Sequence, residues 1–139
     1  MHFSIEALTS EHREIEAALE GLAETIAAGT VNVDALQPLE TLCVRHYQSE
    51  DDFLVWLAAR DAPCAAKLRG QHDEAIELAA RLHEAMNAGQ ERDALYLARR
   101  MLAIVQHNII EEERDVFPHC SLTSRPAGSP DSRPESEST

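Results

Sequence analysis

Long hydrophobic stretches and positive charge are both scarce in this sequence of 139 residues. No apolar run approaches the roughly 20 residues that a helix needs to cross a bilayer. The first residues, MHFSIEALTSEH, lack the basic start and the apolar stretch of a signal peptide, so we expect a cytoplasmic protein without membrane contact. Lysine and arginine number 12 against 25 acidic residues, a formal net charge of -13 that would repel phosphate backbones and argues against nucleic-acid binding.

Aromatic residues and cysteines are also few. Aromatics make up only 4% of the chain, whereas alanine, leucine, glutamate and arginine are abundant. These unbranched side chains lose little rotamer freedom in a helix, which favours an all-α fold. The three cysteines, Cys43, Cys64 and Cys120, form no CxxC motif, and without a thiolate quartet neither structural zinc nor an iron–sulfur cluster is expected.

Apolar residues recur at spacings of three and four along four segments, which is the pattern of amphipathic helices. Their approximate ranges are 5–29, 34–57, 63–87 and 90–117. Short connections favour antiparallel neighbours, so we expect an antiparallel up-down-up-down four-helix bundle over residues 1–120. Residues 121–139 are rich in serine, proline and acidic residues and are predicted to form a disordered tail. A protein partner for this tail is left open.

Polar residues interrupt the apolar stripes at one level of the expected bundle. A carboxylate in a dry interior is so costly that it is normally protonated, paired or bound to metal. Two glutamates each follow a histidine by four residues, a spacing that puts both side chains on one helix face. Counted at about 1.5 Å per residue from the helix ends, the polar positions of all four helices fall in one layer. The sequence therefore predicts a metal centre formed by His12, His46, Glu50, His72, His107 and Glu111.

Mixed imidazole and carboxylate ligands suit iron, manganese or zinc. Six side chains exceed what one four-coordinate zinc ion uses, so we expect two cations bridged by Glu50 and Glu111, with two histidines on each and coordination positions left open. Tyr47 and Glu112 are candidates for further ligands or hydrogen-bond donors, although we expect both to lie at the surface.

Four sequence segments resemble the hemerythrin-like, or HHE cation-binding, family over about residues 5–119. They are LTSEHREIEAALEGL, RHYQSED, LRGQHDEAIEL and QHNIIEEERDVFP, which contain the six candidate ligands. The resemblance implies a four-helix bundle that holds two non-haem iron ions with an oxo or hydroxo bridge.

Two positions differ from the pattern of the oxygen-carrying hemerythrins. Ile76 stands where they have a fifth histidine, and Glu112 stands where they have a bridging aspartate. Four histidines with two glutamates are instead similar to the ligand set of the repair-of-iron-centres proteins, which act in oxidative and nitrosative stress. Those proteins carry a cysteine-bearing N-terminal domain that this chain lacks.

Three functions remain open from the sequence. The leading expectation is a di-iron protein that binds or senses oxygen or nitric oxide. The second is a di-iron enzyme or iron donor in oxidative or nitrosative stress, acting on peroxide or nitric oxide or repairing iron–sulfur clusters. The third is a metal-free or zinc-stabilised bundle that serves as an interaction module.

Overall fold

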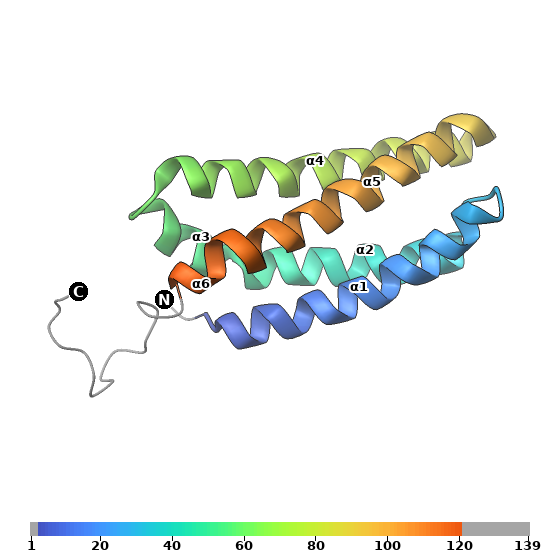
Figure 1. Ribbon diagram of the computed structural model, residues 1–139. Coiled ribbons are helices and arrows are strands. Elements are labelled where there is room, and N and C mark those ends of the chain that lie inside the picture. The colour runs from blue at the N-terminus through green and yellow to red at the C-terminus, as the bar shows by residue number, and fades with distance from the viewer. Residues whose placement is uncertain (1–2, 121–139) are drawn as a thin grey trace, which may run out of the picture.

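The computed structural model describes residues 3–120, and within this range every regular element is helical. The expectation of an all-α protein is therefore confirmed. The predicted tail, residues 121–139, lies outside the described residues. The described residues form four long helices and shorter ones. The long helices lie lengthwise beside one another, and the shorter ones sit at one end (Figure 1). The elements are α1 (Ile5–Ala27), α2 (Val33–Ser49), α3 (Asp51–Ala58), α4 (Ala62–Asn87), α5 (Glu91–Glu111), the π-helical turn η1 (Glu112–Val116) and α6 (Phe117–Cys120).

The helix ends follow from local sequence chemistry. Ser4, Asn32 and Asp61 precede α1, α2 and α4, and each accepts a backbone hydrogen bond from the first turn through its side chain. Gly29 and Gly89 follow α1 and α4 with φ of 93° and 71°, a backbone conformation that glycine adopts without steric cost. The sequence predicted the starts of the four long helices, and the ends of α1 and α4, to within two residues. The fourth expected helix, 90–117, is instead divided into α5, the π-helical turn η1 and α6.

The second expected helix differs from the prediction at one residue. It was expected to run unbroken to about residue 57, but Glu50 separates α2 from α3 with φ of −80° and ψ of −7°. Backbone hydrogen bonds of helical spacing continue on both sides, from the Glu50 N–H to the His46 carbonyl and from the Leu54 N–H to the Glu50 carbonyl, each 2.9 Å long. Glu50 therefore marks a local distortion, and α3 then leads across to α4 (Figure 1).

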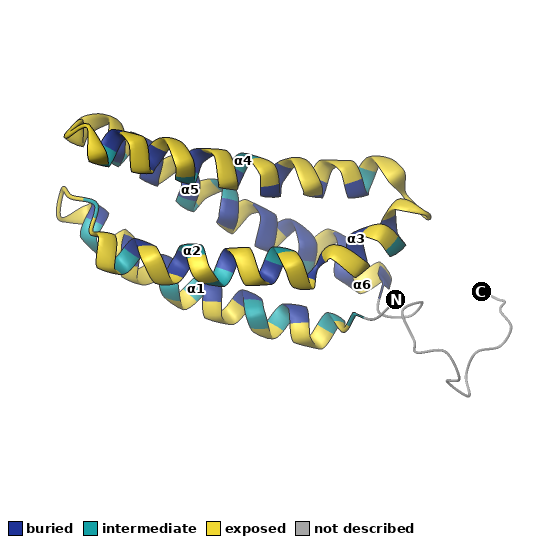
Figure 2. Cartoon of the chain, turned by 180° about the vertical axis from the view of Figure 1, so that it is seen from behind, coloured by how far each residue is buried: buried dark blue, intermediate teal, exposed yellow. Residues whose placement is uncertain are grey.

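Buried residues recur along the long helices and alternate with exposed ones (Figure 2). The buried apolar residues form two clusters. The larger one fills the space between α1, α2, α4 and α5. The smaller one lies where α3, η1, α6 and the first turns of α1 and α4 meet. Buried polar residues fall between the two clusters along the chain: on α1, His12 lies between Leu8 of the smaller cluster and Ile15 of the larger. A polar layer thus separates two dry regions. No helix in the described part of the chain is both long and apolar enough to span a membrane.

Candidate metal centre

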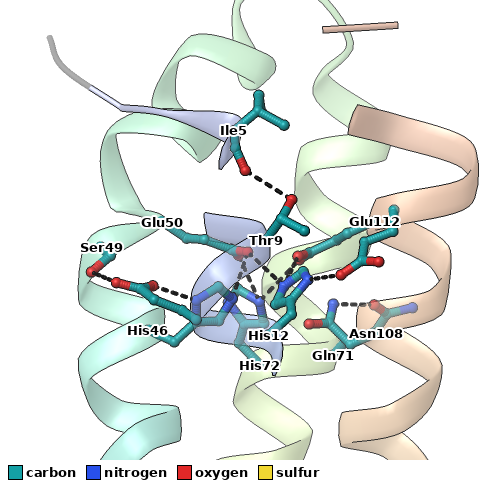
Figure 3. A network of polar contacts seen from close by, with 12 residues as sticks. Ile5, Thr9, His12, His46, Ser49, Glu50, Gln71, His72, Asn108 and Glu112 are labelled. Atoms are coloured by element: carbon teal, nitrogen blue, oxygen red, sulfur yellow. Dashed lines mark hydrogen bonds and ion pairs between the residues drawn. The ribbon is translucent and has the colours of Figure 1, made fainter. Parts of the chain in front are cut away.

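The polar layer brings together side chains from distant parts of the chain (Figure 3). His12 on α1, His46 on α2, Glu50 at the α2–α3 junction and Glu112 at the start of η1 each offer one donor atom, and these atoms all lie within 4.8 Å of one another. All four residues are at most 1% exposed. This group could hold a metal ion, because imidazole nitrogens and carboxylate oxygens are common ligands of divalent and trivalent cations.

His72 on α4 points into the same group. Its Nε2 atom lies 3.1 Å from Glu50 Oε1 and 3.5 Å from Glu112 Oε2. The other imidazoles approach the opposite oxygens, with His46 Nε2 2.8 Å from Glu50 Oε2 and His12 Nε2 3.0 Å from Glu112 Oε1. The structure thus gathers four of the six residues predicted from the sequence, His12, His46, Glu50 and His72.

His107 and Glu111 are not brought to this group. The His107 side chain is 60% exposed, and its Nε2 lies 3.2 Å from Glu111 Oε1, so these two residues do form a pair on one face of α5. Glu111 turns towards α4, where it forms an ion pair with Lys67 and accepts a hydrogen bond of 3.0 Å from the Gln71 amide. The i, i+4 spacing correctly indicated contact between them, but that contact lies outside the buried group.

Glu112 takes the inward position instead, and the expectation that it lies at the surface is wrong, because it is 0% exposed. The buried stripe of α5 passes from Met101 to Val105, Asn108 and Glu112 in steps of four, three and four. The sequence could have indicated the inward position of Glu112, because the helical period that starts at Met101 reaches this residue. His107 lies one residue away from it and therefore faces solvent.

Two imidazoles are oriented by carboxylates on their outer nitrogen. His12 Nδ1 lies 2.7 Å from Glu113 Oε2, and His46 Nδ1 lies 2.6 Å from Glu11 Oε1. Arg13 in turn contacts Glu113, and Ser49 donates a 3.0 Å hydrogen bond to Glu11. A carboxylate that accepts the Nδ1 proton leaves Nε2 as the metal-binding atom, which is a usual arrangement around histidine ligands. The sequence analysis did not identify Glu11 or Glu113.

Aromatic rings stack on two of the imidazoles. Tyr47 stacks on His72 with 4.0 Å between ring centroids and 17° between planes, and Phe117 stacks on His12 at 5.6 Å and 8°. Tyr47 is half-buried, so the surface position expected for it is only partly correct. It contacts a histidine of the group through its ring face and does not act as a donor there.

Burial and the close carboxylates shift the pKa values of the group in opposite directions. Burial alone would lower the pKa of His12, but the close carboxylates of Glu112 and Glu50 outweigh it and raise the pKa to about 10. The same balance raises the pKa of His72 to about 9. For Glu50, the three histidines outweigh burial and hold its pKa well below the usual value, whereas burial and the charge of Glu50 raise the pKa of Glu112.

The nitrogen and oxygen atoms of the group that could bind a metal lack hydrogen-bond partners. Within residues 3–120, the buried side-chain atoms without a partner of acceptable geometry are the Nε2 atoms of His12, His46 and His72 and both carboxylate oxygens of Glu50 and of Glu112. Buried polar atoms in native proteins nearly always have hydrogen-bond partners, so a cluster of such atoms without them is a candidate ligand site. Every one of these atoms is a lone-pair donor once the imidazoles are deprotonated, and the set therefore fits a metal cation.

No family model, curated protein or solved structure matches this chain. Assignment of the site therefore depends on its residues and geometry.

Proposed function

We propose that this protein holds two iron ions in a carboxylate-bridged centre and binds a small diatomic ligand, oxygen or nitric oxide, at that centre. The proposal includes the antiparallel up-down-up-down four-helix bundle of the hemerythrin-like family as the scaffold. The ligand set differs from the one read from the sequence, since Glu112 replaces Glu111 and His107 has no role in it.

The proposal rests on one observation: each of the two carboxylates directs its two oxygens towards different imidazoles. Glu50 directs Oε2 towards His46, at 2.8 Å, and Oε1 towards His72, at 3.1 Å. Glu112 repeats this division, with Oε1 3.0 Å from His12 and Oε2 3.5 Å from His72. Two carboxylates that each face imidazoles with both oxygens are suited to bridge two cations. A single cation would leave several of the buried nitrogen and oxygen atoms without a partner.

The charge balance supports more than one cation. Glu50 and Glu112 are both fully buried and repel each other when ionised, which is why the pKa of Glu112 is raised. Bound cations are the largest local charges in such a site and would stabilise both carboxylates in the ionised form. Iron, when bound with fewer than its full number of protein ligands, supplies an open coordination position for a diatomic molecule. The chain itself supplies orientation of the imidazoles and exclusion of bulk water.

Metal analysis of protein purified from iron-supplied cells tests the proposal. We expect about two irons per chain and near-ultraviolet absorption bands from oxygen-to-iron charge transfer, as a mixed imidazole and carboxylate site predicts. Zinc in place of iron, or one metal per chain, would contradict the di-iron assignment. A matched comparison of Glu50→Gln with Glu40→Gln, which alters a glutamate bonded to His83 away from the centre, distinguishes loss of ligands from a general loss of charge.

A second candidate function is a di-iron enzyme or iron donor in oxidative or nitrosative stress. It is favoured by the small number of imidazoles on the His72 side, because fewer protein ligands leave more room for a substrate. Mixing the diferrous protein with oxygen, peroxide and nitric oxide in a stopped-flow instrument separates the two functions. A stable adduct supports ligand binding, whereas rapid multiple turnover supports an enzyme, and loss of iron to an acceptor protein supports a donor.

A further inference from the structure

The two sides of the centre are unequal. His12 and His46 stand on one side of the carboxylates, and their Nε2 atoms lie 3.7 Å and 2.8 Å from the same oxygen, Glu50 Oε2. His72 is the one imidazole on the other side within the described residues, where it meets Glu50 Oε1 and Glu112 Oε2. A cation beside His72 would therefore have fewer protein ligands than its neighbour and more positions for another molecule.

The same side lies closest to solvent. His72 is 5% exposed, whereas His12, Glu50 and Glu112 are 0% exposed. A surface pocket of about 500 Å³ between α2 and α4 reaches His72, and its lining also includes Val44, Tyr47, Asp51, Arg69, Asp73 and Ile76. The Nε2 atom of His72 is itself buried, so a molecule in the pocket has to pass the stacked rings of Tyr47 and His72 to reach it.

A small apolar cavity of about 110 Å³ adjoins this pocket and shares Val44, Tyr47 and Ile76 with it. The rest of its lining is largely apolar, with Leu39, Cys43, Ala75, Met101 and Val105 among its residues. A largely apolar space of this kind favours small uncharged molecules over ions, because an ion would lose part of its hydration there. The cavity would retain such a molecule beside the Tyr47 ring.

We infer that a small uncharged molecule reaches the centre through the pocket between α2 and α4, past Tyr47, and binds on the His72 side. This inference deepens the proposed function and rests on it. The pocket lining disfavours anions, because Arg69 is already paired with Asp51 at 3.4 Å and Asp73 adds a further negative charge.

Two valines on α2 provide the first test. Val44 lines the pocket and Val33 does not, yet both are 51% exposed, so a tryptophan at either position leaves the core intact. In the iron-loaded, diferrous protein we expect Val44→Trp to slow nitric oxide association about tenfold, within the range over which association rates vary among variants of one site. Val33→Trp should bind nitric oxide at the wild-type rate. Equal rates in both variants would overturn the route.

Charge and metal content provide two further readouts. The association rate of azide, an anion, should rise with ionic strength as the acidic lining is screened, while that of nitric oxide should not change. An azide rate that falls with salt would contradict the negative lining. His72→Ala should reduce the iron content from about two to about one per chain, because it removes the imidazole of the open side.

The outcomes separate this inference from the proposed function. If the wild-type protein retains no iron, both are wrong. If it retains two irons but His72→Ala retains both as well, or if Val44→Trp binds nitric oxide as fast as Val33→Trp, the inference is wrong and the di-iron proposal remains.

Discussion

Glu112 Oε1 lies 3.0 Å from His12 Nε2, whereas the carboxylate of the adjacent Glu111 pairs with Lys67. This difference between neighbours gives a matched pair of variants. We expect Glu112→Gln to weaken metal binding by more than the roughly 10- to 100-fold typical of a partner that only orients a ligand. Glu111→Gln should keep the metal content of the wild type. Metal titration of both variants decides the assignment, and loss of metal in Glu111→Gln alone would restore the ligand set expected from the sequence.

Glu113 supports a second prediction, because it accepts the Nδ1 proton of His12 and also contacts Arg13. Glu113→Gln keeps the size of the side chain but weakens its hold on the imidazole, so metal affinity should fall about 10- to 100-fold. Glu16 is a suitable control, since it too binds Arg13, at 2.8 Å, but touches no imidazole of the centre. Competition with a chelator measures both affinities. Equal affinities in Glu113→Gln and Glu16→Gln would show that Glu113 does not position His12.

The sequence predicted most of the centre where the apolar stripes were clean. On α1, His12 lies between Leu8 and Ile15 at helical spacing, and on α4 a run of apolar residues at the same spacing includes the position of His72, so each histidine is assigned to the core. On α5 the stripe contains Ala94, Ala98 and Asn108, which give little hydrophobic contrast. The i, i+4 spacing of His107 and Glu111 was therefore given more weight than the weak apolar period. As a result, the inward carboxylate was predicted one residue too early, at Glu111 instead of Glu112.

Other features of the centre depend on tertiary contacts that local patterns do not contain. Glu11 is next to His12 in sequence but contacts His46, and Glu113 is next to Glu112 but contacts His12. Many glutamates occur in this acidic chain, so only the packing of α1 against α2 and α5 selects these two. The π-helical turn η1 likewise depends on the packing around it, because its sequence, EERDV, would also suit an α-helix.

Gly21 offers a stability prediction that is independent of metal. It lies within α1 on the exposed side, and a Cβ added there would meet no heavy atom within 4 Å. Gly21→Ala should therefore raise the free energy of unfolding by about 1 kcal/mol through helix propensity. Gly29→Ala should lower it by about 1–2 kcal/mol, because φ of 93° is costly for a residue with a Cβ. Urea denaturation of both variants measures the two effects, and stabilisation by Gly29→Ala would contradict the cap geometry.

The metal-free protein should lose stability at alkaline pH. The pKa values of His12 and His72 are raised to about 10 and about 9 in the folded state, compared with an ordinary value of 6.5. A group whose folded pKa is raised stabilises the fold fully below its unfolded pKa and loses that contribution as pH rises through the folded value. We therefore expect the Tm of chelator-treated protein to fall between pH 6.5 and 10. A Tm that rises across this range would contradict the close contacts of these histidines with Glu50 and Glu112.

Metal binding should release protons at neutral pH for the same reason. His12 and His72 hold protons at pH 7 in the metal-free protein, and a cation that binds their Nε2 atoms has to displace them. Isothermal titration with ferrous iron in buffers of different ionisation enthalpy should give a release of about two protons per chain, since both imidazoles must become neutral to bind metal. In His72→Gln the release should fall by about one, because one of the two protonated imidazoles is absent. Metal binding without proton release would show that the cation binds elsewhere, because neither histidine could then be a ligand.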